Sequence, residues 1–197
     1  LYSLFFQPDP KTISQNSVKK EKIESDGDTP SLELDEKVSS LSREETLKES
    51  KRVFFENSST YGSISLKGGT IDDLTFKKYT NTLKGNDNVV LLNPRSFSDG
   101  YLIETGWATN NKNIDVPNSK TLWKIEGNNK LTPNNPIKLV WSNQQGIKFE
   151  KEISIDDKYL FTIKQEILNS SEKTYDFYAY GQIIRNKVPK IQNFFIL

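Results

Sequence analysis

Three stretches near the end of the chain decide the fold: GIKFEKEISI at residues 146–155, YLFTIKQEILN at residues 159–169 and YDFYAYGQIIR at residues 175–185. The first two largely alternate apolar and polar residues, which is typical of a β-strand with one buried face, and the third is rich in aromatic residues, which also favour strands. Asp156-Asp157 and the Asn-Ser-Ser-Glu run at residues 169–172 are turn sequences. We therefore predict three consecutive antiparallel strands that form a meander.

Shorter strand candidates precede this meander, and they do not alternate with long helices. The candidates are residues 52–57, 62–66, 71–79, 89–92, 101–104, 122–126 and 137–141. Gly68-Gly69 predicts a hairpin turn between the second and third of them. Ser42-Arg43-Glu44-Glu45 has the form of a capping box and predicts a short helix to about residue 50. The pattern favours an all-β, antiparallel sandwich with a short N-terminal helix.

The first part of the chain has a different composition. Residues 7–53 contain no aromatic side chain and are rich in Lys, Glu, Ser, Asp and Thr, which predicts a flexible polar linker over residues 11–40. The domain itself would occupy residues 41–197. Residues 1–6, LYSLFF, fit either a small strand that packs on the core or the outer end of a transmembrane helix that begins before residue 1. The sequence leaves these two alternatives open.

The composition excludes several kinds of active site. The 197 residues contain neither His nor Cys, which removes His-dependent serine triads, thiol nucleophiles, disulfides and His or Cys metal sites. A Ser–Lys pair, a carboxylate pair or an all-oxygen metal site stays open. The 27 basic and 26 acidic residues leave a net charge of +1, too small to attract nucleic acid. We predict no catalytic residue, no metal, no cofactor and no nucleic-acid partner.

The aromatic stretch 175–181 is the main candidate for ligand binding. A strand that is apolar on both faces either packs between two layers or lines a cleft. For the cleft alternative, the candidate ligand-binding residues are Tyr178, Tyr180 and Trp141, since tyrosine combines apolar contact with a hydroxyl group. The packing alternative places the tryptophans in the core.

Asp72-Asp73 is the most obvious pair of carboxylates. Adjacent residues of a strand point to opposite faces, so we do not expect these two to flank one bond as the acids of a glycosidase do.

Taken in chain order, a set of short motifs resembles the periplasmic domain of the YidC family of bacterial membrane protein insertases. The motifs are Ser42-Arg43-Glu44-Glu45, Arg52-Val53, residues 62–66, residues 68–74, Tyr79, residues 91–94, residues 139–141, Gly146 with Phe149, residues 153–156 with 159–161, Asn169-Ser170 and residues 181–185. The resemblance covers residues 1–197. Its most specific part, residues 68–74, departs from the family in having Thr70 where Arg is common, a change that we expect at the surface.

The resemblance implies a β-supersandwich, similar to galactose mutarotase-like folds, in the periplasm at the bacterial inner membrane. It implies that residues 1–10 end a membrane-proximal helix and that the domain continues past residue 197, because residues 193–197 look like a strand in progress. The mutarotase analogy stops at the fold, since those enzymes use histidines.

The implied function is that of a non-catalytic scaffold or chaperone-like domain in an insertase that places nascent inner-membrane proteins in the bilayer. The implied partners are those nascent proteins and the Sec translocon with its accessory subunits of the SecD/SecF type. The alternative is a carbohydrate- or polymer-binding β-sandwich module. A carboxylate-dependent hydrolase, the third possibility, needs two acidic groups that converge in a pocket.

Overall fold

The computed structural model describes residues 41–188. The membrane-proximal helix end at 1–10, the linker at 11–40 and the strand expected at 193–197 lie outside these residues. The described elements are α1 (Arg43–Lys48), β1 (Arg52–Glu56), β2 (Thr60–Ser65), β3 (Thr70–Thr80), β4 (Asn88–Leu92), β5 (Tyr101–Ala108), β6 (Lys124–Glu126), β7 (Lys130–Leu131), β8 (Ile137–Ser142), β9 (Ile147–Ile155), β10 (Phe161–Asn169) and β11 (Tyr178–Arg185).

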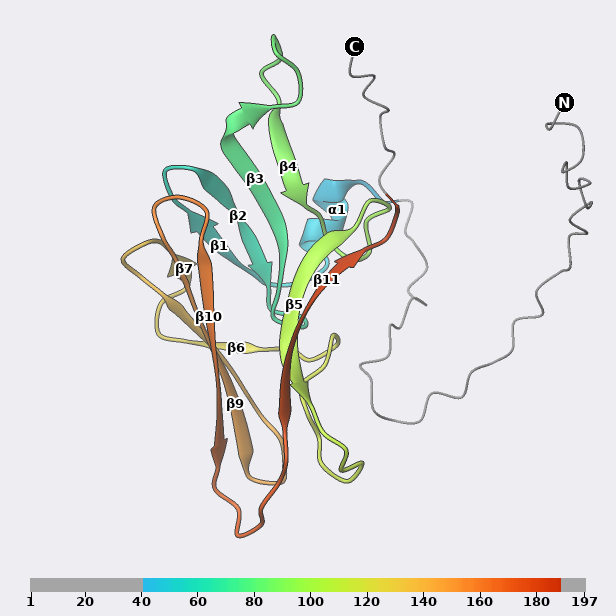
Figure 1. Cartoon of the computed structure of the whole chain (residues 1–197), viewed down its shortest axis with the longest axis vertical. Helices are drawn as coiled ribbons and strands as arrows, with labels where there is room; N and C mark the ends of the chain where they lie inside the picture. The colour runs from blue at the N-terminus through green and yellow to red at the C-terminus, as the bar shows by residue number, and fades with distance from the viewer. Residues whose placement is uncertain (1–40, 189–197) are drawn as a thin grey trace, which may run out of the picture.

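The strands form two sheets that pack against each other as a sandwich (Figure 1). One sheet has the order β11-β5-β3-β2-β1-β7, with β4 also paired to β3, and the other has the order β10-β9-β8-β6. Strand pairing is antiparallel except between β1 and β7. The predicted all-β antiparallel sandwich is confirmed. The two-residue strand β7 has too short a pattern to be predicted from sequence.

The predicted meander is wrong in its third strand. β9 and β10 pair along nine positions as expected, but β11 pairs with β5 of the other sheet, from Tyr178↔Ala108 to Arg185↔Tyr101. The segment before β11 crosses between the sheets, and the Phe177 ring packs edge-on against Phe149 at 5.4 Å. Because β5 offers an open edge eight residues long, β11 completes the larger sheet instead of extending the smaller one.

An apolar layer fills the space between the sheets, and we call it the inter-sheet layer. Its fully enclosed members come from both sheets and include Val53, Phe55, Ile64, Leu131, Ile137, Leu139, Ile147, Phe149 and Ile153. Phe149 lies at its centre, with ring-centroid distances of 5.2 Å to Trp107 and 5.8 Å to Trp141. Trp107 and Trp123 are each 4% exposed, which confirms that these tryptophans belong to the core.

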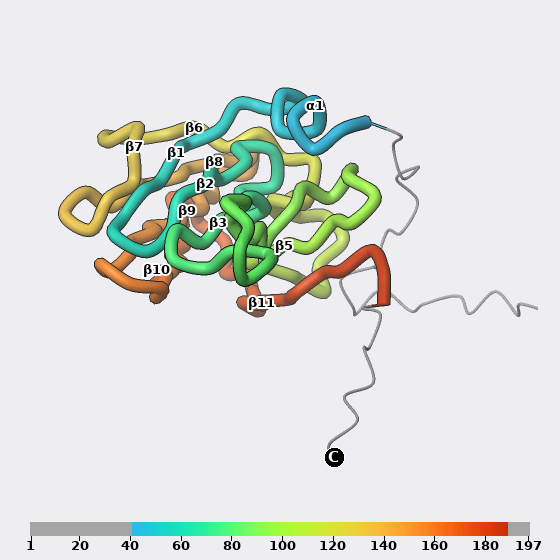
Figure 2. Tube along the Cα trace, turned by 90° about the horizontal axis from the view of Figure 1, so that it is seen from above, coloured from blue at the N-terminus to red at the C-terminus, as the bar shows by residue number. Residues whose placement is uncertain are grey.

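The helix α1 begins at the predicted capping box. The Ser42 hydroxyl accepts a hydrogen bond from the Glu45 N–H at 3.3 Å, and the Glu45 carboxylate accepts one from the Ser42 N–H at 2.8 Å. α1 lies beside the seven-stranded sheet, on the side away from β9 and β10 (Figures 1 and 2). Across residues 41–188, no helix has the length and apolar character needed to cross a membrane.

Candidate functional site

The face of the seven-stranded sheet that turns away from β8–β10 carries buried polar side chains. Residues alternate between faces along a strand, so the neighbours of core residues on β1 and β5 point to this outer face. Nine residues form what we call the outer polar layer: Arg43, Arg52, Ser63, Asp72, Asp73, Arg95, Glu104, Tyr180 and Gln182. α1 covers part of it through Arg43.

Ser63 joins the two aspartates of β3 into one network. Its hydroxyl accepts a hydrogen bond from Arg52 Nε at 2.7 Å and donates one to Asp73 Oδ2 at 2.6 Å. Arg52 Nη2 in turn donates to Asp72 Oδ1. The Arg52 and Asp72 side chains are only 6% and 7% exposed, so this ion pair is buried.

A β-bulge explains why Asp72 and Asp73 share a face, contrary to the prediction from strand alternation. Ser63 pairs with Asp73, but the next residue of β2, Ile64, pairs with Ile71. Asp72 is therefore the extra residue that opposes no partner, and such a residue interrupts the alternation of faces.

Each of the two carboxylates is already held by an arginine. Asp72 is paired with Arg52, and Asp73 with Arg43. Burial raises the pKa of Asp72 to about 6, and the nearby Arg52 guanidinium only partly offsets that effect. A hydrolytic pair needs free carboxyl groups on either side of a substrate bond. The bulge brings the two aspartates together, but this geometry does not support the hydrolase alternative.

Arg43 attaches α1 to the sheet. Its Nη2 donates to Asp73 Oδ1, and its Nε donates to Asn93 Oδ1 at 2.8 Å. The helix is six residues long, which is too short for intrinsic stability in water, so these contacts hold it in place.

A polar hollow opens between α1, the outer face and two loops. It contains about 450 Å³ of space, part of it open to solvent. Its lining residues are Thr46, Glu49, Ser50, Arg52, Ser65, Lys67, Thr70, Asp72, Pro94, Arg95, Ser96 and Ser119. Thr70 is 5% exposed, so the expectation of a surface position is wrong: the side chain lies beneath α1 and loop 94–96.

Glu104 organises the second half of the outer polar layer. This buried carboxylate accepts hydrogen bonds from the Tyr180 hydroxyl at 3.0 Å and from Gln182 Nε2 at 3.1 Å, and it is paired with Arg95. Burial and the charge of Glu104 together raise the pKa of Tyr180 above its usual range. The cluster joins β5, β11 and loop 94–96.

The three predicted ligand-binding residues lie in two different places. Tyr178 and Tyr180 share one face of β11, and the Tyr178 ring is 55% exposed. Trp141 packs into the inter-sheet layer from β8. Within residues 41–188, no aromatic ring contact joins Trp141 to either tyrosine. Ligand binding at these residues stays a prediction.

The outer polar layer was not predicted from the sequence. The only sign of it in the sequence is a set of polar residues, such as Ser63 and Glu104, at the outward positions of strands whose inner face is apolar. That pattern also describes an ordinary solvated face, so it does not reveal burial under α1 and the loops.

The described residues do not form an obvious metal-binding site. Between residues 41 and 188, no three Asp or Glu side chains gather closely enough to hold a metal ion.

Several known proteins that are similar to this chain belong to one family. The family model described as the YidC periplasmic domain matches residues 52–197. Membrane protein insertase YidC of Pelagibacter ubique is 60% identical over 197 residues, the whole of this chain and 35% of that protein. The YidC insertases of Mesorhizobium japonicum and Rickettsia bellii are 34% and 41% identical over 87% and 68% of this chain, and the matches cover 28% and 24% of those proteins.

The chain thus spans about a third or less of each of these relatives. The matched residues contain the eleven strands found between residues 41 and 188, and they include the bulge and the buried ion pair of Arg52 with Asp72. On this basis, the chain belongs to the YidC family of bacterial membrane protein insertases and carries the periplasmic domain of that family.

Proposed function

We propose that this chain is the non-catalytic periplasmic part of an insertase that assists the insertion and folding of inner-membrane proteins, alone or with the Sec translocon. The observation that carries the proposal is the family match over residues 52–197, together with 60% identity to a YidC insertase along the whole chain. The domain would stand on the periplasmic side of the bacterial inner membrane.

The described geometry supports a scaffold that presents a surface to partners. A buried ion pair links β1 to β3, a partly exposed one links α1 to β3, and the Glu104 cluster links β5 to β11. Such hydrogen-bonded networks hold elements in one arrangement and give a partner a fixed surface to recognise. We propose nascent inner-membrane proteins and Sec subunits of the SecD/SecF type as those partners.

An insertion assay tests the proposal. An insertase of the relatives' length that carries this chain would be reconstituted in proteoliposomes, with and without residues 41–188. We expect the shortened protein to insert a single-span test protein in the absence of Sec, because the domain is non-catalytic. Photo-crosslinking from exposed positions of the domain should capture Sec subunits in inner-membrane vesicles.

Two outcomes would contradict the proposal. Complete loss of Sec-independent insertion in a correctly assembled shortened protein would place an essential step in the domain. The partner-binding role would be contradicted if positions spread over both sheets gave no crosslinks to Sec subunits or to nascent chains. A position inside the inter-sheet layer, such as Leu139, serves as the negative control because it is fully buried.

A further inference from the structure

One lysine lies inside the inter-sheet layer. Lys151 on β9 is 1% exposed and occupies the same strand face as Phe149 and Ile153. Its cross-strand neighbours are Leu139 on β8 and Gln165 on β10, both uncharged. A buried ammonium group ordinarily requires a counter-ion, because an isolated charge in an apolar interior is very unfavourable.

The Lys151 side chain reaches across the sandwich to the other sheet. Nζ donates to the carbonyl oxygens of Thr105 on β5 and of Gly69, the latter at 3.5 Å. Nζ lies 4.9 Å from the Trp123 ring centroid and 5.9 Å from that of Trp107. Beside it, Gln165 Nε2 donates to the Gly106 carbonyl at 2.9 Å. Both side chains therefore connect β5 to the four-stranded sheet.

Carboxylates do not pair with this amine in the part of the chain that is described. Glu104 on β5 acts on it only through its charge, since its oxygens are bonded on the outer face. On β9 itself, Glu152 is exposed and Glu150 points to the opposite face, where it pairs with Lys138 and Lys148.

The hydrogen-bonding groups around Nζ match a neutral amine better than an ammonium group. A neutral amine has two N–H donors and one lone pair, whereas an ammonium has three donors and no acceptor. The surroundings offer two carbonyl acceptors and one unused donor, because the buried indole N–H of Trp123 has no partner.

Gly69 brings the indole nitrogen and the amine to one place. A Cβ atom on this glycine would lie 3.0 Å from Trp123 Nε1 and 3.4 Å from Lys151 Nζ, so both nitrogens border the same small space. The backbone of Gly69 also has φ +62°, which favours glycine. The close approach of the backbone gives the amine its carbonyl partner.

We propose that Lys151 is an internal pH switch of the sandwich: its amine, enclosed between the two sheets without a counter-ion, loses its proton while the domain stays folded, and the neutral amine then links the two sheets and offers its lone pair to Trp123. Burial lowers the pKa of Lys151 to about 8, and the charge of Glu104 opposes this effect. In the protonated form the charge is desolvated without a counter-ion, and the two carbonyls and the faces of the Trp107 and Trp123 rings offset only part of that cost.

The direction of the stability change follows from linkage. The unfolded chain keeps the ordinary pKa of 10.5, so it binds more protons than the folded chain between about pH 8 and 10.5. The Lys151 contribution to stability therefore increases as the pH rises through this window. Tyr180 acts in the opposite direction only above its ordinary pKa of 10, where the unfolded chain loses the phenol proton that the folded chain keeps.

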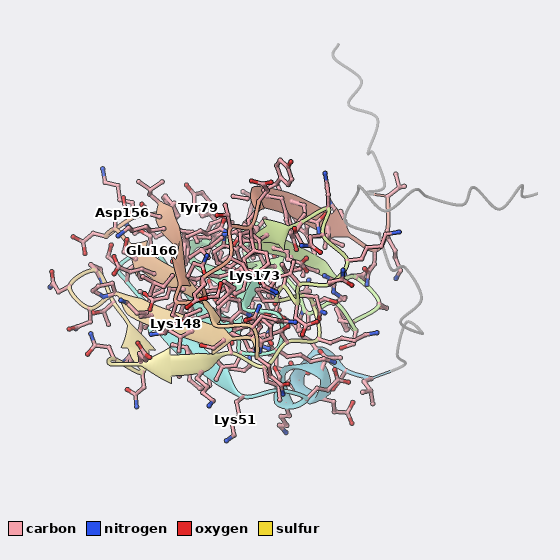
Figure 3. All side chains as sticks on the ribbon, turned by 90° about the horizontal axis from the view of Figure 1, so that it is seen from below. Lys51, Tyr79, Lys148, Asp156, Glu166 and Lys173 are labelled. Carbon is pink, nitrogen blue, oxygen red and sulfur yellow. The ribbon has the colours of Figure 1, made fainter. Side chains whose placement is uncertain are left out.

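NMR of the 197-residue chain labelled with ¹³C at the lysine ε-carbons tests the proposal directly. We expect one lysine signal to titrate with a midpoint near pH 8, well below the value of about 10.4 that is ordinary for a lysine side chain in water. The shifted signal should be missing in Lys151→Met and retained in Lys148→Met. Lys148, labelled in Figure 3, is the matched control on the opposite face of β9, where its carboxylate partners raise its pKa.

Titration of every lysine signal near or above pH 10 in the folded wild-type chain would overturn the proposal, and this result needs no variant. Thermal unfolding supplies a second readout. The melting temperature of the wild type should rise from pH 8 to 9.5 relative to Lys151→Gln or Lys151→Met, whichever folds. Parallel pH profiles for wild type and variant would also overturn the switch.

Discussion

The inter-sheet layer and the outer polar layer lie on opposite faces of the same strands, yet different forces stabilise them. Val53 on β1 is fully buried among apolar side chains, while its neighbour Arg52 is bonded to Ser63 and Asp72. Burial of apolar area favours the first layer without requiring precise geometry. The second layer stabilises the fold only if every charged group keeps its partner, because an unpaired buried charge is strongly unfavourable.

Phe149→Ala tests the inter-sheet layer and should have the largest effect. The ring is fully buried and contacts Trp107, Trp141 and Phe177, so its removal leaves a cavity that these rings cannot all fill. We expect a loss of about 4 kcal/mol in the free energy of unfolding. Urea unfolding followed by tryptophan fluorescence measures it. A loss under about 1 kcal/mol would mean that this layer is loosely packed.

Arg52→Ala breaks the outer polar layer, and we expect it to cost about 3 kcal/mol because Asp72 is left buried and unpaired. The double variant Arg52→Leu with Asp72→Leu should be more stable than the single variant, since it removes both charges. Urea unfolding of both variants checks this order. A double variant less stable than Arg52→Ala would show that the layer depends on its hydrogen bonds more than on charge compensation.

The sequence predicted the inter-sheet layer better than the outer polar layer for a physical reason. Strand periodicity is local, so the residue pattern was enough to predict β1 and β9, which carry Val53 and Phe149, as strands. The ion pairs join residues 20 and 30 positions apart, and they depend on the bulge at Asp72. A bulge is set by the register of two strands, which neither strand encodes alone.

The partner of β11 was unpredictable for a related reason. The turn sequence after β10 suggested a hairpin, but two sheet edges competed for the next strand. Packing of Phe177 in the inter-sheet layer and pairing along β5 decided the outcome. This pairing separates two of the predicted ligand-binding residues. Tyr178 lies on the outer face of the larger sheet, whereas Trp141 packs in the inter-sheet layer.

Asp72→Asn tests the outer polar layer through the pH dependence of the free energy of unfolding. Burial raises the pKa of Asp72 to about 6 from its ordinary 3.8, so the folded chain binds more protons than the unfolded chain between these values. The contribution of Asp72 to stability is complete below pH 3.8 and is lost as the pH rises through 6. Asparagine does not titrate. Relative to wild type, the variant should therefore gain on the order of 2 kcal/mol between pH 4 and pH 7.

Urea unfolding at several pH values between 4 and 7 measures that gain for Asp72→Asn. Asp156→Asn is a suitable control, because backbone N–H groups lower the pKa of this exposed carboxyl group from its ordinary 3.8. Its contribution to stability therefore changes only below that value, and the variant should follow the wild-type pH profile between pH 4 and 7. Equal pH profiles for wild type and Asp72→Asn would mean that Arg52 compensates the buried charge fully.

Tyr178→Ala should have the smallest effect on stability, and it distinguishes a scaffold domain from a ligand-binding domain. The ring is 55% exposed at the start of β11, and we expect a change within about 0.5 kcal/mol in the free energy of unfolding. Tyr180→Ala should cost more, because it removes a donor from the buried Glu104.

If the domain is a scaffold, calorimetric titration with oligosaccharides should show no saturable binding. Saturable binding that Tyr178→Ala abolishes without loss of stability would instead support the carbohydrate-binding alternative, since an exposed tyrosine that does little for folding is free to contact a ligand.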